Sequence, residues 1–114
     1  MAKGFGGMGE MGGFMREAQK QAQSMQKRMA ELQADLKQRV YDGSAGGGKV
    51  VAHANGLREL LAIKISPDVV DSQDVEMLED LVTVAVQQAM KKAEQAHTDE
   101  MTRLTGGLGL PGMF

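Results

Sequence analysis

The chain has 114 residues, no cysteine and a net charge of -2, with 42% hydrophobic and 25% charged residues. This length allows one domain with a small core, and the lack of cysteine excludes disulfides and thiolate metal sites. No apolar run reaches the roughly 18 residues of a transmembrane helix, and the glycine-rich start lacks the core of a signal peptide. We therefore expect a cytosolic protein without a membrane partner.

The charge is unevenly distributed along the chain. Residues 1–64 contain ten Lys/Arg and six Asp/Glu, a net charge of +4, whereas residues 65–114 contain three and nine, a net charge of -6. Affinity for nucleic acid depends on Lys and Arg at the phosphates, which the overall negative charge disfavours. The asymmetry nevertheless allows a basic surface on an acidic protein.

The first predicted element is a helix from about Phe14 to about Lys37. Its apolar residues recur at steps of three and four: Phe14, Ala18, Ala22, Met25, Met29, Leu32 and Leu36. Such a helix would be roughly 36 Å long at about 1.5 Å per residue. Because a small sheet cannot cover that length, part of the helix should project or meet another chain. The Gly- and Met-rich residues 1–13 are expected to form a flexible tail.

Three short antiparallel strands are predicted next: Arg39–Tyr41, Lys49–Ala54 and Glu59–Ile65. The residues Gly43–Gly48 indicate a flexible connection between the first two strands. Asn55 and Gly56 indicate a type I′ hairpin turn between the last two, because both residues tolerate positive φ. The Leu and Ile side chains of the third strand should give the meander an apolar side that a helix covers.

A second long helix is predicted from near Asp74 to near Leu104, followed by the stop signal Gly106-Gly107. The candidate N-caps are Asp71, Ser72 and Asp74. Residues 106–114 should form a second flexible tail. The sequence thus predicts an α+β fold over residues 14–105: a long helix, a three-stranded antiparallel meander and a long helix.

This order, together with particular segments, resembles the YbaB/EbfC family. The segments that carry the resemblance are the Gly/Met-rich start, Met15–Lys37, Asp42–Val50, Asn55-Gly56, Ile63-Lys64-Ile65 with Pro67, Glu76–Val82, and Leu104–Gly112. The resemblance implies a homodimer joined through its sheets, with helical arms that project like tweezers and bind double-stranded DNA. It also implies a cytoplasmic protein of the bacterial nucleoid and, for some members, a role in gene regulation.

The candidate DNA-binding residues are the basic side chains of the two helices: Arg16, Lys20, Lys27 and Arg28 on the first, and Lys91, Lys92 and Arg103 on the second. The path of the chain brings Arg16, Lys20 and Arg103 nearest to the tips of the arms. There they could grip a duplex by its phosphates. The alternative interpretation of each residue is an ordinary solvated helix face.

No pattern in the chain predicts an enzyme, a cofactor, a metal site or a small-molecule substrate. Residues Gly43–Lys49 match the start of a phosphate-binding loop, but Val50 stands where that loop needs a Ser or Thr hydroxyl, and a strand is expected to follow. His53 and His97 lack further ligands at metal-binding spacing. With three Phe and one Tyr, the chain also lacks an aromatic platform for stacking bases.

A second function class stays open. In a protein-interaction scaffold, the same arms and the Met/Gly-rich ends would hold a partner protein, and DNA affinity would be incidental. The overall acidic charge favours this alternative, and a salt series separates the two because phosphate contacts weaken steeply with salt.

Overall fold

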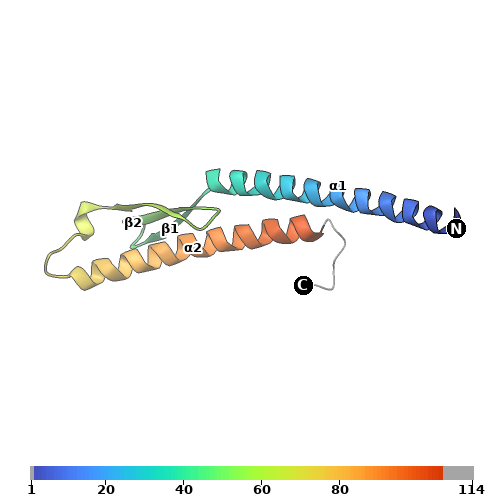
Figure 1. Cartoon of the computed structure of the whole chain (residues 1–114). Coiled ribbons are helices and arrows are strands. Elements are labelled where there is room, and N and C mark those ends of the chain that lie inside the picture. The colour runs from blue at the N-terminus through green and yellow to red at the C-terminus, as the bar shows by residue number, and fades with distance from the viewer. Residues whose placement is uncertain (1, 107–114) are drawn as a thin grey trace. The chain divides into compact units, whose positions relative to one another are not determined.

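The structure is a computed structural model that describes the backbone of residues 2–106 and the side chains of residues 11–106. Its elements are α1 (Ala2–Gln38), β1 (Val40–Ala45), β2 (Val50–Asn55), β3 (Leu60–Ile65), a 3-10 turn η1 (Pro67–Val69) and α2 (Val75–Gly106) (Figure 1). The predicted order of helix, three-stranded antiparallel meander and helix is confirmed. The chain divides within α1, between Gln33 and Ala34, into two compact units.

Helix α1 begins at Ala2, twelve residues before the start that the apolar spacing predicts. The glycines before Phe14 each cost a helix about 1 kcal/mol relative to Ala, but they do not block it, and no proline precedes Gln38. The helical boundary at Phe14 was therefore wrong. Flexibility of residues 1–13 is a separate property and stays a prediction, and the predicted C-terminal tail lies outside the described residues from Gly107 onward.

Helix α2 packs along one face of the sheet, over β1 and β2 (Figure 1). The core between them consists of small residues. The fully buried members are Val50, Ala52 and Ala54 from β2 and Ala85, Ala89 and Ala93 from α2. Alanine lets the helix approach closely, but its small side chain removes little apolar surface from water. Since burial stabilises the fold by about 25 cal/mol for each Å² of apolar surface, each alanine contributes little. The core is therefore tight and small.

The edge of β1 is closed by two side chains of α2. Gln88 accepts a hydrogen bond from the backbone N–H of Ser44 at 3.1 Å, and the Lys92 ammonium donates to the carbonyl oxygen of Asp42 at 2.8 Å. These backbone groups would otherwise be free to pair with another strand. The edge of β1 is thus partly covered by side chains of α2.

The glycine-rich segment after Tyr41 is more ordered than its composition suggests. Gly43 to Ala45 pair with β2, and only Gly46–Lys49 form the turn. Gly46, Gly47 and Gly48 all have positive φ, between 64° and 89°, which side chains other than glycine rarely adopt. The predicted flexible connection over Gly43–Gly48 was therefore too long. Strand β2 follows the turn, as expected, and no helix opens there.

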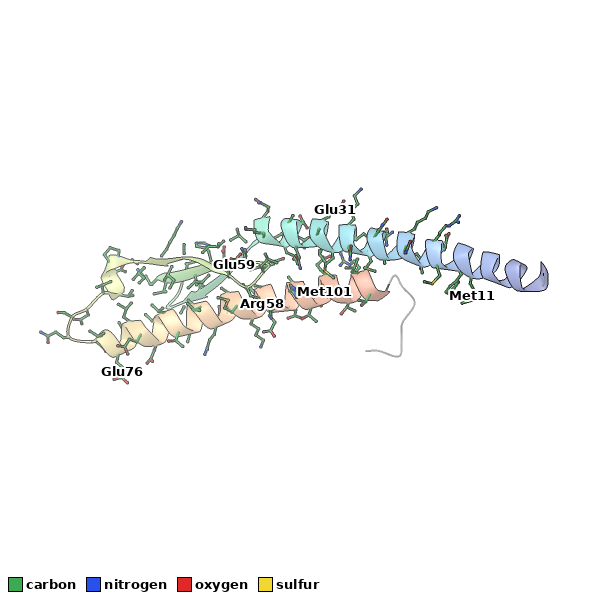
Figure 2. The ribbon with its side chains drawn as sticks, viewed as in Figure 1. Met11, Glu31, Arg58, Glu59, Glu76 and Met101 are labelled. Atoms are coloured by element: carbon green, nitrogen blue, oxygen red, sulfur yellow. The ribbon has the colours of Figure 1, made fainter. Side chains whose placement is uncertain are left out.

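The turn between β2 and β3 differs from the predicted type I′ turn. Asn55 is the last residue of β2, and the positive φ, 64°, belongs to Arg58. Arg58 and Glu59 lie between β2 and β3 (Figure 2). The buried Asn55 side chain holds the turn, because its Oδ1 accepts from the N–H groups of Leu57 and Glu59, both at 3.0 Å. Gly56 is needed for space: a Cβ there would lie 2.7 Å from the carbonyl oxygen of Leu36.

Strand β3 is exposed, contrary to the prediction that a helix covers its apolar side. Its large apolar side chains are 37–52% exposed: Leu60, Leu61, Ile63 and Ile65. His53 pairs with Ala62, but the next residue, Ala54, pairs with Leu60. Leu61 is therefore an extra residue in a β-bulge, and the predicted alternation of side chains between the two faces of β3 is interrupted there. Ile63 and Ile65 pair with buried residues of β2, but α2 barely reaches β3.

Helix α2 begins as the sequence predicts. The Asp74 carboxylate accepts a hydrogen bond from the N–H of Met77 at 3.2 Å and is the N-cap among the three candidates. Asp71 instead organises the preceding turn, where its carboxylate accepts from the N–H of Gln73 at 2.9 Å. Over the described residues, neither helix has a stretch apolar enough to cross a membrane.

Candidate nucleic-acid interface

Three basic residues of α1 form one face of the helix, here called the basic stripe: Arg16, Lys20 and Lys27. They are separated by four and seven residues, which brings them onto the same side. The apolar residues that recur at steps of three and four along α1 form a second face, here called the apolar stripe. Its member Met25 is nine residues from Arg16, which is about two and a half turns at 3.6 residues per turn. The basic and apolar stripes therefore lie on opposite sides of α1.

All members of the basic stripe are exposed, and within the side chains described, residues 11–106, none of them forms an ion pair. Arg28 is also exposed but lies about 100° around the helix from Lys27. A row of exposed cations without carboxylate partners is chemically suited to a polyanion. Each such side chain can replace a counterion at a phosphate.

The basic residues predicted on α2 have different surroundings. Lys91 is exposed and borders an open hollow of about 330 Å³ that Glu94 and Asp99 also line. Lys92 donates to the backbone of β1 and serves the fold. Arg103 is 76% exposed and pairs with Glu100 at 3.2 Å. These residues form no row like that on α1. That Arg16, Lys20 and Arg103 meet at the arm tips stays a prediction.

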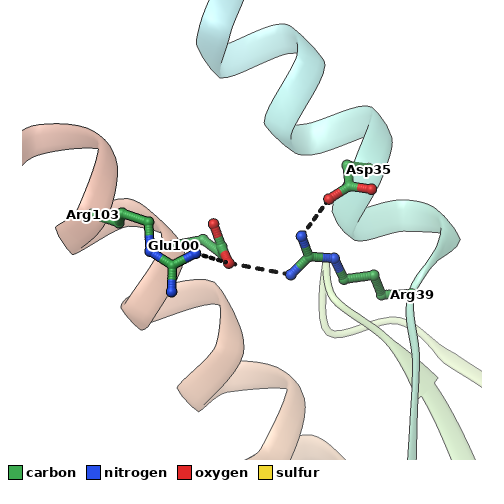
Figure 3. A network of polar contacts seen from close by, with 4 residues as sticks. All are labelled: Asp35, Arg39, Glu100 and Arg103. Atoms are coloured by element: carbon green, nitrogen blue, oxygen red, sulfur yellow. Dashed lines mark hydrogen bonds and ion pairs between the residues drawn. The ribbon is translucent and has the colours of Figure 1, made fainter. Parts of the chain in front are cut away.

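Arg39 is a basic residue that the sequence did not single out. It follows the end of α1, and its guanidinium pairs with Asp35 at 2.5 Å and with Glu100 of α2 at 3.3 Å (Figure 3). Contact with Tyr41, and then with Glu100 and Asp35, raises the pKa of Arg39 further above its usual value. Arg39 and Glu100 are 61 positions apart, and no periodicity in the sequence links them.

The remaining candidate chemistry is sparse in the part of the chain described. Nδ1 of His53 lies 2.5 Å from the carboxylate of Asp42 on the neighbouring strand. No three metal-binding side chains gather within the described residues. Lys49, the lysine of the apparent phosphate-binding loop, pairs with Asp68, and β2 follows it directly.

Comparison with known proteins identifies the family. Residues 9–108 match the YbaB/EbfC DNA-binding family. A nucleoid-associated protein of Clostridium novyi is 51% identical over 111 residues, 96% of this chain and 97% of that protein. A second, from Thermoanaerobacter pseudethanolicus, is 50% identical over the full length of both chains. An uncharacterised protein of Helicobacter pylori has the same fold, with a TM-score of 0.68 at 23% identity over 74% of this chain and 88% of that one. The chain therefore belongs to the YbaB/EbfC DNA-binding family.

Proposed function

We propose that this protein binds double-stranded DNA as a homodimer, mainly through phosphates, and thereby contributes to nucleoid organisation and gene expression. The observation that carries this proposal is the basic stripe of α1, whose three cations are exposed and lack carboxylate partners among the described side chains. Arg28, Lys91 and Arg103 are proposed as flanking contacts. The names of the clostridial and Thermoanaerobacter relatives support a role at the nucleoid.

Phosphate contact is preferred over base readout for a physical reason. Reading base edges requires side chains held in fixed, bidentate geometry against the groove. The stripe consists of long, exposed side chains on one helix, and within the described residues no aromatic platform accompanies them. Binding should therefore depend strongly on salt and only weakly on DNA sequence.

The two edges of the sheet support a homodimer joined through β3. Gln88 and Lys92 already occupy two backbone groups at the edge of β1, the N–H of Ser44 and the carbonyl oxygen of Asp42. Strand β3, in contrast, has an open edge and four large apolar side chains that are 37–52% exposed. A second copy would cover this apolar surface and add to a core in which Leu36 and Val50 are the only fully buried apolar residues larger than Ala among those described.

The alternative function, a protein-interaction scaffold, is favoured by apolar side chains on α1. Met11, Phe14 and Met15 are 57–73% exposed. Flexible thioether side chains adapt well to partner surfaces. Such a contact would depend on apolar burial and would change little with salt.

A salt series with a fluorescent duplex of mixed sequence tests the proposal, with the dimer measured by light scattering. If each stripe residue of two protomers neutralises one phosphate, log K should fall against log salt with a slope of about -5. The variant Arg16→Gln/Lys20→Gln/Lys27→Gln should lose most of this slope and remain dimeric. Salt-independent binding, or no binding at low salt, would overturn the proposal and favour the scaffold.

A further inference from the structure

The last turn of α1 is held by a polar link to α2. The two terminal nitrogens of the Arg39 guanidinium point in different directions, one to Asp35 of α1 and one to Glu100 of α2 (Figure 3). The same Glu100 oxygen also accepts a hydrogen bond from Arg103, and the Glu100 side chain is only 16% exposed. Two guanidiniums and two carboxylates thus form one network without net charge.

A second set of contacts holds the same turn from the side of the sheet. Leu36 is fully buried, and its carbonyl oxygen accepts hydrogen bonds from the N–H groups of Gly56, at 2.8 Å, and Arg39, at 3.2 Å. The β2–β3 turn therefore fixes where α1 ends. The Arg39 link joins this end to α2.

We propose that Glu100 is a positioning residue for DNA binding, acting with Arg39 to fix the direction of α1 at its last turn. The proposal rests on the proposed function of the basic stripe. Because α1 is one continuous helix, a tilt at Leu36 is amplified along its length. Lys20 lies about 24 Å along the helix axis from Leu36 at about 1.5 Å per residue, so a tilt of about 10° moves it by roughly 4 Å.

A direct phosphate contact is a poor explanation of the Arg39 side chain. Both of its terminal nitrogens already donate to carboxylates, and their charges offset its own. A guanidinium that bridges two carboxylates restrains both of them, whereas a Lys ammonium is a single point charge without that planar fork. The geometry of the Arg39 contacts is suited to holding the end of α1 against α2.

The substitution Glu100→Ala separates positioning from charge, because the two effects have opposite signs. Removing a carboxylate from a DNA-binding protein should strengthen binding by electrostatics alone. Loss of positioning should weaken it, by about three- to tenfold. Glu94→Ala is the matched control, since Glu94 is an exposed residue of the same helix outside the network and loses the same charge.

Direct evidence comes from a distance measurement without DNA. Because the chain has no cysteine, spin labels can be attached at Gln26→Cys and Gln95→Cys, two exposed positions on α1 and α2. Labelled chains are mixed with excess unlabelled protein so that only distances within one chain are measured. Glu100→Ala should broaden or shift this distance distribution, and Glu94→Ala should leave it unchanged.

An unchanged distribution in Glu100→Ala, or binding that tightens as in Glu94→Ala, would overturn the positioning role. If Glu100→Ala does not fold, Arg39→Lys is measured instead. It keeps the charge but loses the planar fork, so it should broaden the distribution and weaken binding, and unchanged values would again overturn the role. If the parent protein does not bind the duplex at all, the proposed function fails, while the distance measurement still decides whether Glu100 positions α1.

Discussion

The backbone of Gly43 lies against the backbone of Ala85: a Cβ on Gly43 would come within 2.1 Å of the Ala85 carbonyl oxygen and 2.4 Å of the Ala89 nitrogen. Neither atom is the end of a flexible side chain, so the helix or the strand would have to move. Glycine at this position is therefore a requirement of packing.

We expect Gly43→Ala to lower the free energy of unfolding by about 3 kcal/mol, the upper range for overpacking a core. Urea denaturation followed by circular dichroism measures this loss. Gly12→Ala is the control, because nothing lies within 4 Å of a Cβ there, and alanine should leave the stability unchanged or slightly higher. Equal effects of the two substitutions would refute the packing argument.

The two adjacent lysines of α2, Lys91 and Lys92, should contribute differently to the stability of the fold. Lys92→Met removes the hydrogen bond to the Asp42 carbonyl, and we expect a loss of about 1 kcal/mol of stability. Lys91→Met removes an exposed side chain and should leave stability unchanged. Thermal or urea unfolding of both variants measures the difference. A Lys91 variant as unstable as the Lys92 variant would contradict the assignment of Lys92 to the edge of β1.

Two lysines of α1 offer a matched test of the basic stripe. Lys27→Gln should lower the salt slope of DNA binding by about 2 in a dimer, one phosphate contact for each protomer. Lys37→Gln makes the same change of charge at a position off the stripe and should have a smaller effect on the slope. Anisotropy titrations at several salt concentrations give both slopes. Equal losses would mean that α1 acts by its total charge.

The open edge of β3 predicts the dimer contact. Ile63→Glu should shift light scattering from the mass of two chains toward one, because a charge would be buried against the partner. Val84→Glu is the control. Val84 is similarly exposed, at 43% against 37% for Ile63, but it lies on α2. Dissociation by Val84→Glu alone would move the interface to the helix.

The contact between Lys49 and Asp68 should make stability depend on pH. Hydrogen bonds from Lys49 and then Ser66 lower the pKa of Asp68 from 3.8 to about 2. A carboxylate whose pKa is lower in the folded state stabilises the protein fully above 3.8 and loses this contribution as the pH falls toward 2. Asp68→Asn should therefore be less stable than the parent at pH 7, and this difference should shrink over that acid range.

Unfolding midpoints at several pH values test this expectation. In a Lys49→Gln background, Asp68 loses its main partner, so the acid-dependent difference should become smaller. A difference between the parent and Asp68→Asn that stays constant from pH 7 to acid would show that the ion pair does not contribute.

The sequence predicted those parts of the fold that depend on local patterns. The two long helices and three strands follow from periodicity, and all are present. Capping preferences gave three candidates for the start of α2, of which the structure selects Asp74. Composition alone could not assign the glycines. Gly43 and Gly56 are needed for close approach to other elements, whereas Gly46–Gly48 are needed for positive φ. These two requirements look identical in a sequence.

The candidate interface was predictable only in part. The basic residues of α1 could be predicted as candidates because the spacing of residues along a helix determines which side each one faces. The same spacing separates the basic stripe from the apolar stripe. The roles of Lys92 and Arg39 depend on contacts across 50 and 61 positions of the chain, for which the sequence has no local signal. The exposure of β3 was missed for the same reason, since it depends on which strands α2 covers.

The arrangement of the sheet also implies an order of events during synthesis. Each strand pairs with its neighbour in the chain, so the meander closes through short loops, on a timescale of about 1–10 μs for each hairpin. Val50, Ala52 and Ala54 are nevertheless packed against residues of α2, the last element. A nascent chain that ends before Ala85 can form its strands but leaves their apolar face in water, and only the final third of the protein completes the core.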